Sequence, residues 1–265
     1  MNEMTARAAA LGGLVLVVIS IWLDAVGGQS YWDDGTQGVF MLILALGAGL
    51  LLAMSWMQNR AEPARTAAAL SFLLLGYTTW IIAVTAFGNW GEIDAGGWLA
   101  WIGSIVAALG AWVGSQSMGT RPLMASAMGM RGVQMGALAA LGGVVLCVIS
   151  IWLEANSNNG LSYWDYSDDK ILGIVMLVAA GLTGAALFGA WSGRGQGAAL
   201  WASAFATLLW GLFLLGPVTA AFGDFGSLGA GGWLGFFGGL IAVGGACLAH
   251  ASTAKAHVAS PAPAV

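Results

Sequence analysis

Charged residues are scarce in this sequence. Asp, Glu, Lys and Arg make up 8% of the 265 residues, whereas a soluble domain carries about 25%. Apolar residues make up 59% of the chain, and the mean hydropathy is +0.84. A water-exposed surface with so few charges would not keep the protein in solution. The composition therefore excludes an ordinary soluble domain and indicates an integral membrane protein.

Histidine is almost absent, because the two residues of this type, His250 and His257, both lie near the C-terminus. A bis-histidine haem site, a histidine-based zinc site and a Ser/His/Asp triad each need at least one histidine among the internal segments. The sequence has none there, so we expect none of these sites. No base or acid falls deep within an apolar segment, which argues against a retinal Schiff base, a voltage sensor or a proton relay. We therefore expect no enzymatic activity, no metal and no cofactor.

Cysteine, phosphate-binding and calcium-binding patterns are also missing. Cys147 and Cys247 each lie within an apolar segment, where a thiol usually acts as a small apolar side chain, and they imply no disulfide framework. The chain contains no GxxxxGK[ST] motif, and its acidic stretches do not match an EF-hand loop. The pI of about 4.9 argues against nucleic acid as a partner.

Apolar runs of about 20 residues recur along the chain, and each is long enough to cross roughly 30 Å of hydrocarbon as a helix. Lipid offers no partner to backbone N–H and C=O groups, so we expect helices rather than open strands. We predict an all-α integral membrane protein with eight spans, at residues 8–24, 37–57, 66–87, 96–115, 133–153, 171–191, 198–222 and 230–250.

The two halves of the chain repeat one another. Leu11–Asp24 matches Leu141–Glu154, the motif SYWD occurs at Ser30 and Ser162, and FGNWGEIDAGGWL at Phe87 matches FGDFGSLGAGGWL at Phe222. Four spans return the chain to its starting side, so the sequence predicts two tandem four-helix repeats of the same orientation. A pseudo-two-fold axis along the membrane normal would relate them.

The domain boundaries follow from this repeat. We expect a first repeat at 1–115, a cytoplasmic linker at 116–132, a second repeat at 133–251 and a disordered cytoplasmic tail at 252–265. Small residues four apart predict close helix packing in the last span of each repeat. They are Gly96, Ala100, Ser104 and Ala108 in the first repeat, and Gly231, Gly235 and Gly239 in the second.

All the Lys and Arg residues except Lys170 fall on one side of the predicted topology. Cytoplasmic loops retain Lys and Arg, so we expect both termini to be cytoplasmic. The Ala/Gly-rich composition suggests a bacterial protein, which would place the chain in the inner membrane. The one-sided bases are Arg7, Arg60, Arg65, Arg121, Arg131, Arg194 and Lys255.

Most acids fall on the opposite, outer side, and four of them are candidate site residues. Asp24 and Glu154 are expected at the outer ends of the first and fifth spans, where the helix dipole disfavours an acid. Asp33 and Asp165 follow in the SYWD motifs. These carboxylates are either hydrated loop residues or an acidic outer vestibule around the pseudo-axis that attracts cations.

Two further groups of residues are candidates. Trp22, Trp32, Trp152 and Trp164 lie near the predicted outer ends of spans, as an interfacial aromatic belt or as a platform for a lipid or pigment. The third span carries Tyr77, Thr78 and Thr79, whose hydroxyls either bond within their own helix or form a polar patch for a ligand.

Three functions follow from these patterns. The first is a non-catalytic structural, accessory or assembly subunit of a membrane complex, with lipids and other membrane subunits as partners. The second is a cation channel or passive carrier with an acidic outer vestibule. The third is a lipid- or pigment-binding membrane protein.

Overall fold

The computed structural model describes residues 3–33, 35–58, 61–89, 92–117, 129–157, 160–165, 170–192, 196–214 and 228–258. The described part of the chain is mostly helical, at 83%. The helices are α1 (Glu3–Ser20), α2 (Thr36–Gln58), α3 (Ala61–Asn89), α4 (Ala95–Ser117), α5 (Gly129–Ser150), α6 (Ile171–Trp191), α7 (Gln196–Leu212) and α9 (Ala230–Val258).

Six of these helices are long and apolar enough to cross a membrane, namely α2, α3, α4, α5, α6 and α9. The other two predicted spans correspond to shorter apolar helices, Met4–Ser20 and Gly197–Leu212. These findings indicate a multi-pass membrane protein. The predicted seventh span covers 198–222, and within it α7 ends at Leu212. Residues 215–227 lie outside the described residues.

The predicted first and fifth spans, 8–24 and 133–153, are also too long. The backbone N–H groups of residues 21–23 donate to carbonyl oxygens three residues earlier, at 3.2–3.4 Å, and residues 151–153 do the same. Such tightened bonds are typical of the last turn of a helix. Each chain segment then leaves the helix axis and enters a short strand. At the other end of the chain, α9 continues to Val258, into the predicted tail.

Each of these exits leads into a β-hairpin. Strand β1 (Asp24–Val26) pairs antiparallel with β2 (Gln29–Ser30), and β3 (Glu154–Asn156) pairs with β4 (Leu161–Ser162). Between β1 and β2, Gly27 and Gly28 have φ of +58° and +77°, the combination that a type I′ turn requires. Our sequence analysis did not predict these strands, because two or three residues are too few to show an alternating pattern.

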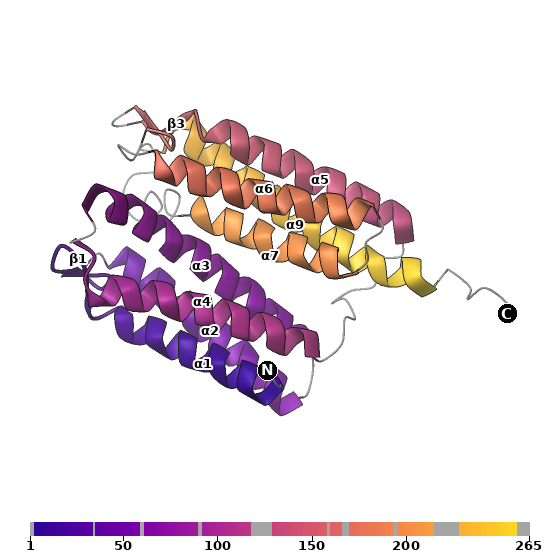
Figure 1. The fold of residues 1–265 in the computed structure, drawn as a ribbon, viewed down its shortest axis with the longest axis horizontal. Coiled ribbons are helices and arrows are strands. Elements are labelled where there is room, and N and C mark those ends of the chain that lie inside the picture. The colour runs from indigo at the N-terminus through magenta and orange to yellow at the C-terminus, as the bar shows by residue number, and fades with distance from the viewer. Residues whose placement is uncertain are drawn as a thin grey trace.

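The helices run along a common direction, and the hairpins lie at the opposite end of the bundle from the start of α1 and the end of α9 (Figure 1). We refer to the end with β1 and β3 as the hairpin end, and to the end where α1 begins and α9 ends as the termini end. Helix α1 packs against α4, and α5 packs against α9. Helices α3 and α7 lie side by side in the middle. Helix α3 also packs against α4, and α7 against α9, so the α3–α7 contact joins a first group of helices (α1 to α4) to a second group (α5 to α9).

Glycines let the paired helices approach to backbone contact. A Cβ atom on Gly13 of α1 would lie 2.5 Å from the backbone nitrogen of Ala107 in α4. A Cβ atom on Gly143 of α5 would collide in the same way with Ala242 of α9. Two of the glycines predicted to pack closely do lie against backbone. A Cβ atom on Gly96 of α4 would lie 2.6 Å from the carbonyl oxygen of Leu23, and one on Gly239 of α9 would lie 3.0 Å from the Cα atom of Trp210 in α7.

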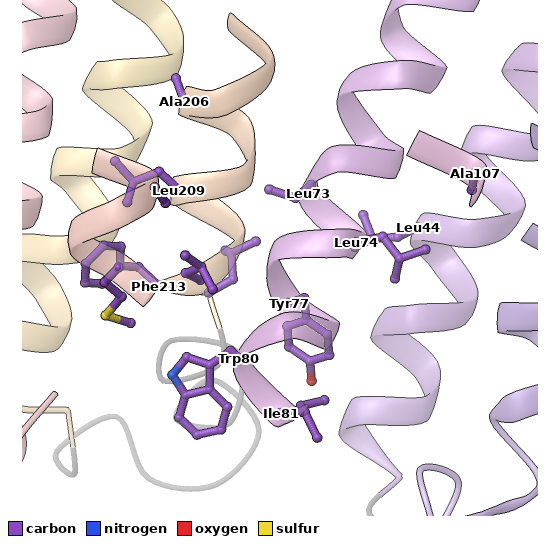
Figure 2. Packing of buried hydrophobic residues seen from close by; sticks show 14 of the residues in the cluster. Leu44, Leu73, Leu74, Tyr77, Trp80, Ile81, Ala107, Ala206, Leu209 and Phe213 are labelled. Carbon is purple, nitrogen blue, oxygen red and sulfur yellow. The ribbon is translucent and has the colours of Figure 1, made fainter. Parts of the chain in front are cut away.

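The contact between α3 and α7 is made in the same way. A Cβ atom on Gly76 would run into the carbonyl oxygen of Leu208, and one on Gly211 would run into the carbonyl oxygen of Leu73. Figure 2 shows buried residues of both helices around this junction, among them Leu73 and Leu209. The two groups of helices therefore meet through backbone atoms, with no layer of side chains between them at this point.

The substitution Gly76→Ala is expected to lower the free energy of unfolding by about 1–3 kcal/mol, because the added methyl overpacks the α3–α7 contact. Gly244→Ala is the matched control, since a Cβ atom there meets nothing within 4 Å. Alanine is also the better helix former, so the control should be neutral or slightly stabilising. Thermal unfolding in detergent measures both variants, and equal stability of the two would contradict the backbone contact.

Candidate functional site

Asp24 and Glu154 do not lie at helix ends, so this part of the prediction is wrong. Each is the exposed first residue of a hairpin strand, because α1 ends at Ser20 and α5 ends at Ser150. Strand β1 contacts α4, and β3 contacts α9. Figure 1 places the two hairpins at separate corners of the hairpin end, with α3 between them. The structure therefore does not bring these two carboxylates together.

Asp33 and Asp165 each lock a turn with the serine three residues earlier. The backbone N–H and the hydroxyl of Ser30 both donate to Asp33 Oδ2 at 2.8 Å. The hydroxyl of Ser162 donates to Asp165 Oδ2 at 2.7 Å. The two N–H and O–H bonds from Ser30 hold the pKa of the Asp33 carboxyl below its ordinary value of 3.8. Both acids are exposed, yet each has a structural role.

The middle residues of the SYWD motifs point in opposite directions. Tyr31 and Tyr163 are buried, each with 4% of its surface exposed. Burial raises the pKa of the Tyr31 phenol, and its hydroxyl has no hydrogen-bond partner among the described residues. Trp32 is 44% exposed. The motif thus combines a stabilised turn and a buried tyrosine with an indole that is exposed at Trp32 and half-buried at Trp164.

The four candidate tryptophans form two separate stacked pairs. The ring centroids of Trp22 and Trp32 lie 5.6 Å apart at 30°, and those of Trp152 and Trp164 lie 5.7 Å apart at 28°. Trp22 and Trp152 are both 52% exposed. Beside the second pair, Lys170 Nζ lies 5.7 Å from the Trp164 ring centroid, within range of a cation–π interaction. The exposed indoles have the amphipathic character that favours the headgroup zone of a bilayer.

The candidate polar patch is divided between two faces of α3. Thr78 Oγ1 lies 2.8 Å from Ser104 Oγ of α4, and the indole N–H of Trp101 donates to Thr79 Oγ1 at 3.1 Å. The ring of Tyr77 instead lies 5.0 Å from that of Phe40 in α2. Thr78 and Thr79 therefore fasten α3 to α4. Ser104 and Trp101 are partners that the sequence analysis missed.

Most other hydroxyls in the helices bond to their own backbone. Each donates to a carbonyl oxygen three or four residues earlier, at 2.6–3.2 Å. Such bonds satisfy a hydroxyl locally and leave it little need for a ligand. These residues are Ser20, Ser71, Ser115, Ser150, Thr183, Ser192, Ser203, Thr207 and Ser252.

Asp94 is a further outer acid whose role the sequence did not reveal. Its carboxylate accepts a hydrogen bond from the backbone N–H of Gly28 at 2.9 Å, and its own N–H donates to the carbonyl oxygen of Ala25 at 3.0 Å. The N–H of Gly27 donates to the carbonyl oxygen of Glu92 at 2.9 Å. These bonds tie the segment before α4 to the first hairpin.

An aromatic cluster crosses from α3 and α4 to α7. The ring of Trp112 lies 5.8 Å from that of Phe72 and 4.6 Å from that of Trp201, which stacks on Phe205 at 5.3 Å. Trp112 is 6% exposed, and its indole N–H has no acceptor among the described residues. Trp201 is 38% exposed. The cluster thus combines an unsatisfied buried donor with an accessible ring.

Three bases at the termini end are buried, which the sequence analysis did not foresee. Arg7 is 5% exposed, Arg65 is 9% exposed and His250 is 8% exposed. Among the described residues, no group of three or more His, Cys, Asp or Glu side chains could hold a metal ion.

No protein-family model, curated protein or solved structure matches the chain. The interpretation of these sites therefore depends on their geometry alone.

Ser30→Ala is expected to raise the pKa of Asp33 toward 3.8, because it removes one of the two bonds that stabilise the carboxylate. A depressed pKa stabilises the fold above the ordinary value, and this contribution is lost as the pH falls through and below 3.8. Carboxyl chemical shifts measured by NMR during titration check the prediction. Ser203→Ala is the control, since Ser203 bonds to its own helix. An unchanged Asp33 pKa in Ser30→Ala would refute the turn lock.

Proposed function

We propose that the chain is a non-catalytic membrane protein with eight transmembrane helices in two tandem four-helix repeats of the same orientation. We further propose that it serves as a structural or accessory subunit of a membrane complex. Its acidic hairpin loops face the outside of a bacterial inner membrane, and both termini are cytoplasmic.

Matching contacts at matching positions support the duplication. The hairpin registers Asp24↔Ser30 and Glu154↔Ser162 correspond, as do the two tryptophan pairs. The α3–α7 contact is reciprocal, because Gly76 and Gly211 are separated by the same 135 residues as the repeated FG motifs at Phe87 and Phe222. A pseudo-two-fold axis at this contact accounts for that reciprocity.

The lengths of the two short helices are compatible with spanning. Helix α1 has 18 residues and α7 has 17. At 1.5 Å per residue each is about 26 Å long, close to the hydrocarbon thickness of roughly 30 Å. The turn at residues 21–23 extends α1 further toward the hairpin end. Counting both as spans gives eight.

The distribution of charges supports the orientation. Arg7, Arg65 and Arg131 lie in the parts of α1, α3 and α5 at the termini end, whereas Asp24 and Glu154 lie in the hairpins. Bases mark the cytoplasmic side of a membrane protein. Arg60, Arg121 and Arg194 fall outside the described residues.

The observation that carries the subunit role is the backbone contact between Gly76 and Gly211. A cation pathway along the pseudo-axis needs water between the two repeats, and this contact leaves no gap there. The separation of Asp24 from Glu154 also removes the shared acidic vestibule that a channel on the axis would need. Helices packed through backbone, with hydroxyls bonded locally, suit a rigid membrane component.

Liposomes containing the purified protein are expected to pass potassium no faster than protein-free liposomes, because the axis is closed. Flux of a cation-sensitive dye measures this, and an added ionophore shows that the assay responds. A potassium flux that is abolished by Asp24→Asn with Glu154→Asn would establish the channel in place of the subunit.

A subunit role also predicts a protein partner that stays bound after gentle extraction. Mass measurement of the particle, solubilised from its native membrane in mild detergent, is expected to exceed one chain plus detergent. A particle containing one chain and no second protein would count against the role.

Binding of a lipid or pigment is the second candidate function, and the aromatic cluster favours it. The buried N–H of Trp112 needs an acceptor, which the carbonyl oxygen of a bound molecule would supply. The exposed ring of Trp201 offers a stacking surface beside it.

Trp112→Phe keeps a ring in the cluster but removes the donor, so it is expected to lose a copurifying ligand that the wild type retains. Trp210→Phe is the matched control, because its indole N–H is also buried without an acceptor but faces Gly239 of α9. Organic extraction followed by mass spectrometry measures the ligand. Retention of equal amounts by both variants would exclude a role for the Trp112 donor.

A further inference from the structure

The two stacked tryptophan pairs at the hairpin end have nearly the same geometry, but they differ in charge. The ring centroids lie 5.6 Å apart in the pair Trp22–Trp32 and 5.7 Å apart in the pair Trp152–Trp164. On the second pair, Lys170 Nζ lies 5.7 Å from the Trp164 ring centroid, within the range of a cation–π interaction. The second pair therefore holds an ammonium group that comes from the protein itself.

The position of Lys170 corresponds to Gly35 in the first half, at the offset of 135 residues. The backbone bonds agree with this correspondence. The carbonyl oxygen of Lys170 accepts a hydrogen bond from the N–H of Ile174 at 3.1 Å, and that of Gly35 accepts one from Val39 at 3.1 Å. Because glycine has no side chain, the first pair lacks the ammonium group that the second pair receives.

The charges around the first pair are negative. The sequence contains no Lys or Arg from residue 8 to residue 59, so the first hairpin contributes no base of its own. It carries two exposed carboxylates, Asp24 and Asp33. Asp24 lies opposite Ser30 in the hairpin register, and the Ser30 hydroxyl donates to Asp33 Oδ2 at 2.8 Å. A cation at the first pair is therefore attracted by the neighbouring carboxylates.

The first pair is also accessible, and it continues into an apolar surface. Trp22 is 52% exposed and Trp32 is 44% exposed, whereas Trp164 is half-buried. Ile19 and Val15 of α1, three and seven residues before Trp22, are 48% and 56% exposed. Residues at this spacing lie along one face of a helix. A molecule that covers the two rings can thus extend an apolar chain along α1.

These features match a positive charge joined to an apolar chain. The face of an indole attracts an ammonium group through its quadrupole. Exposed indoles favour the headgroup zone of a bilayer. A phospholipid with an amine headgroup combines an ammonium group at the membrane surface with acyl chains in the hydrocarbon. It therefore meets the rings with its charge and the exposed side chains of α1 with its chains.

We propose that the Trp22–Trp32 pair binds the ammonium headgroup of an aminophospholipid. The ammonium group lies on the indoles beside the hairpin carboxylates, and an acyl chain lies along α1. Lys170 supplies the corresponding ammonium group to the second pair. This inference rests on the membrane-spanning architecture and the repeat proposed above, and it is independent of the subunit role.

The test uses an equimolar mixture of phosphatidylethanolamine and phosphatidylglycerol as the probe of the full-length protein in detergent. Native mass spectrometry of the wild type is expected to show about two- to fivefold greater retention of phosphatidylethanolamine, the effect of a cation–π contact at an exposed site. Equal retention of the two lipids, or a preference for phosphatidylglycerol, overturns the proposal without reference to any variant.

Trp32→Leu removes one ring of the first pair and is expected to bring the ratio of the two retained lipids to about one. Trp56→Leu is the matched control, because Trp56 is 45% exposed but lies near the end of α2, away from the hairpins. Loss of the preference in Trp32→Leu alone supports the site. Loss in both variants, or in neither, refutes it.

Lys170→Gly gives the second pair the residue found at the corresponding position of the first. The variant is expected to fold, because Lys170 has a φ of +56° and glycine adopts such a backbone conformation readily. Removal of the internal ammonium group is expected to let a second phosphatidylethanolamine bind with the same preference. Retention of one preferred lipid, as in the wild type, would overturn the proposed equivalence of the two pairs and with it the site.

Two other occupants of the first pair are outcomes of the same test. Free ethanolamine carries the ammonium group without acyl chains, and we expect it to compete weakly. If it displaces phosphatidylethanolamine at equal concentration, the lipid assignment is wrong. If the particle extracted from its native membrane binds phosphatidylethanolamine only after a protein partner is removed, the rings hold that partner and the lipid assignment is again wrong.

The outcome is separable from that of the proposed function. Lipid retention is measured in detergent, without a membrane gradient. A potassium flux in liposomes would remove the subunit role and leave the lipid preference intact. Equal retention of the two lipids would remove the lipid site and leave the flux prediction standing.

Discussion

Contact between helix backbones is the constraint on which the rest of this structure depends. In lipid, apolar side chains gain little by leaving their solvent, so helices associate mainly through close van der Waals packing. Gly13, Gly143, Gly76 and Gly211 each lie where a Cβ atom would collide with a neighbouring helix. The first two join α1 to α4 and α5 to α9, and the last two join the halves. The arrangement of the helices in the bundle therefore follows from the positions of these glycines.

The hairpin end depends on a different interaction, the bond from Ser30 or Ser162 to the aspartate three residues later. This bond holds the turn that buries the tyrosine and stacks the tryptophan on its partner. Asp94 adds a tie from the loop before α4 to the first hairpin. Three of the outer acids thus have structural partners. Among the described residues, these turns occur only at the hairpin end. The one-sided distribution of the acids therefore needs no transported cation to explain it.

The helices could be predicted because many residues encode each one, whereas the short strands and single contacts were missed because few residues encode them. Apolar runs gave the helices, because each run sums over about 20 residues. Repeated motifs placed Asp24 and Glu154 at equivalent positions, but hydropathy extended both spans past the true helix ends. The strands at Asp24 and Glu154 are too short to show a period. The hydrogen bond from the backbone of Gly28 to Asp94 joins residues 66 positions apart, a contact that no local pattern encodes.

The predicted repeats differ in the side chains that pack at corresponding positions. Thr78 bonds to Ser104 in the first half, whereas the corresponding Phe213 fills the space beside Gly235 in the second. A hydrogen bond therefore joins α3 to α4, whereas an aromatic side chain packs at the corresponding contact between α7 and α9. The two contacts therefore tolerate different side-chain chemistry. The helix spacing is set where backbones approach at glycine, and the neighbouring side chains fill the space that remains.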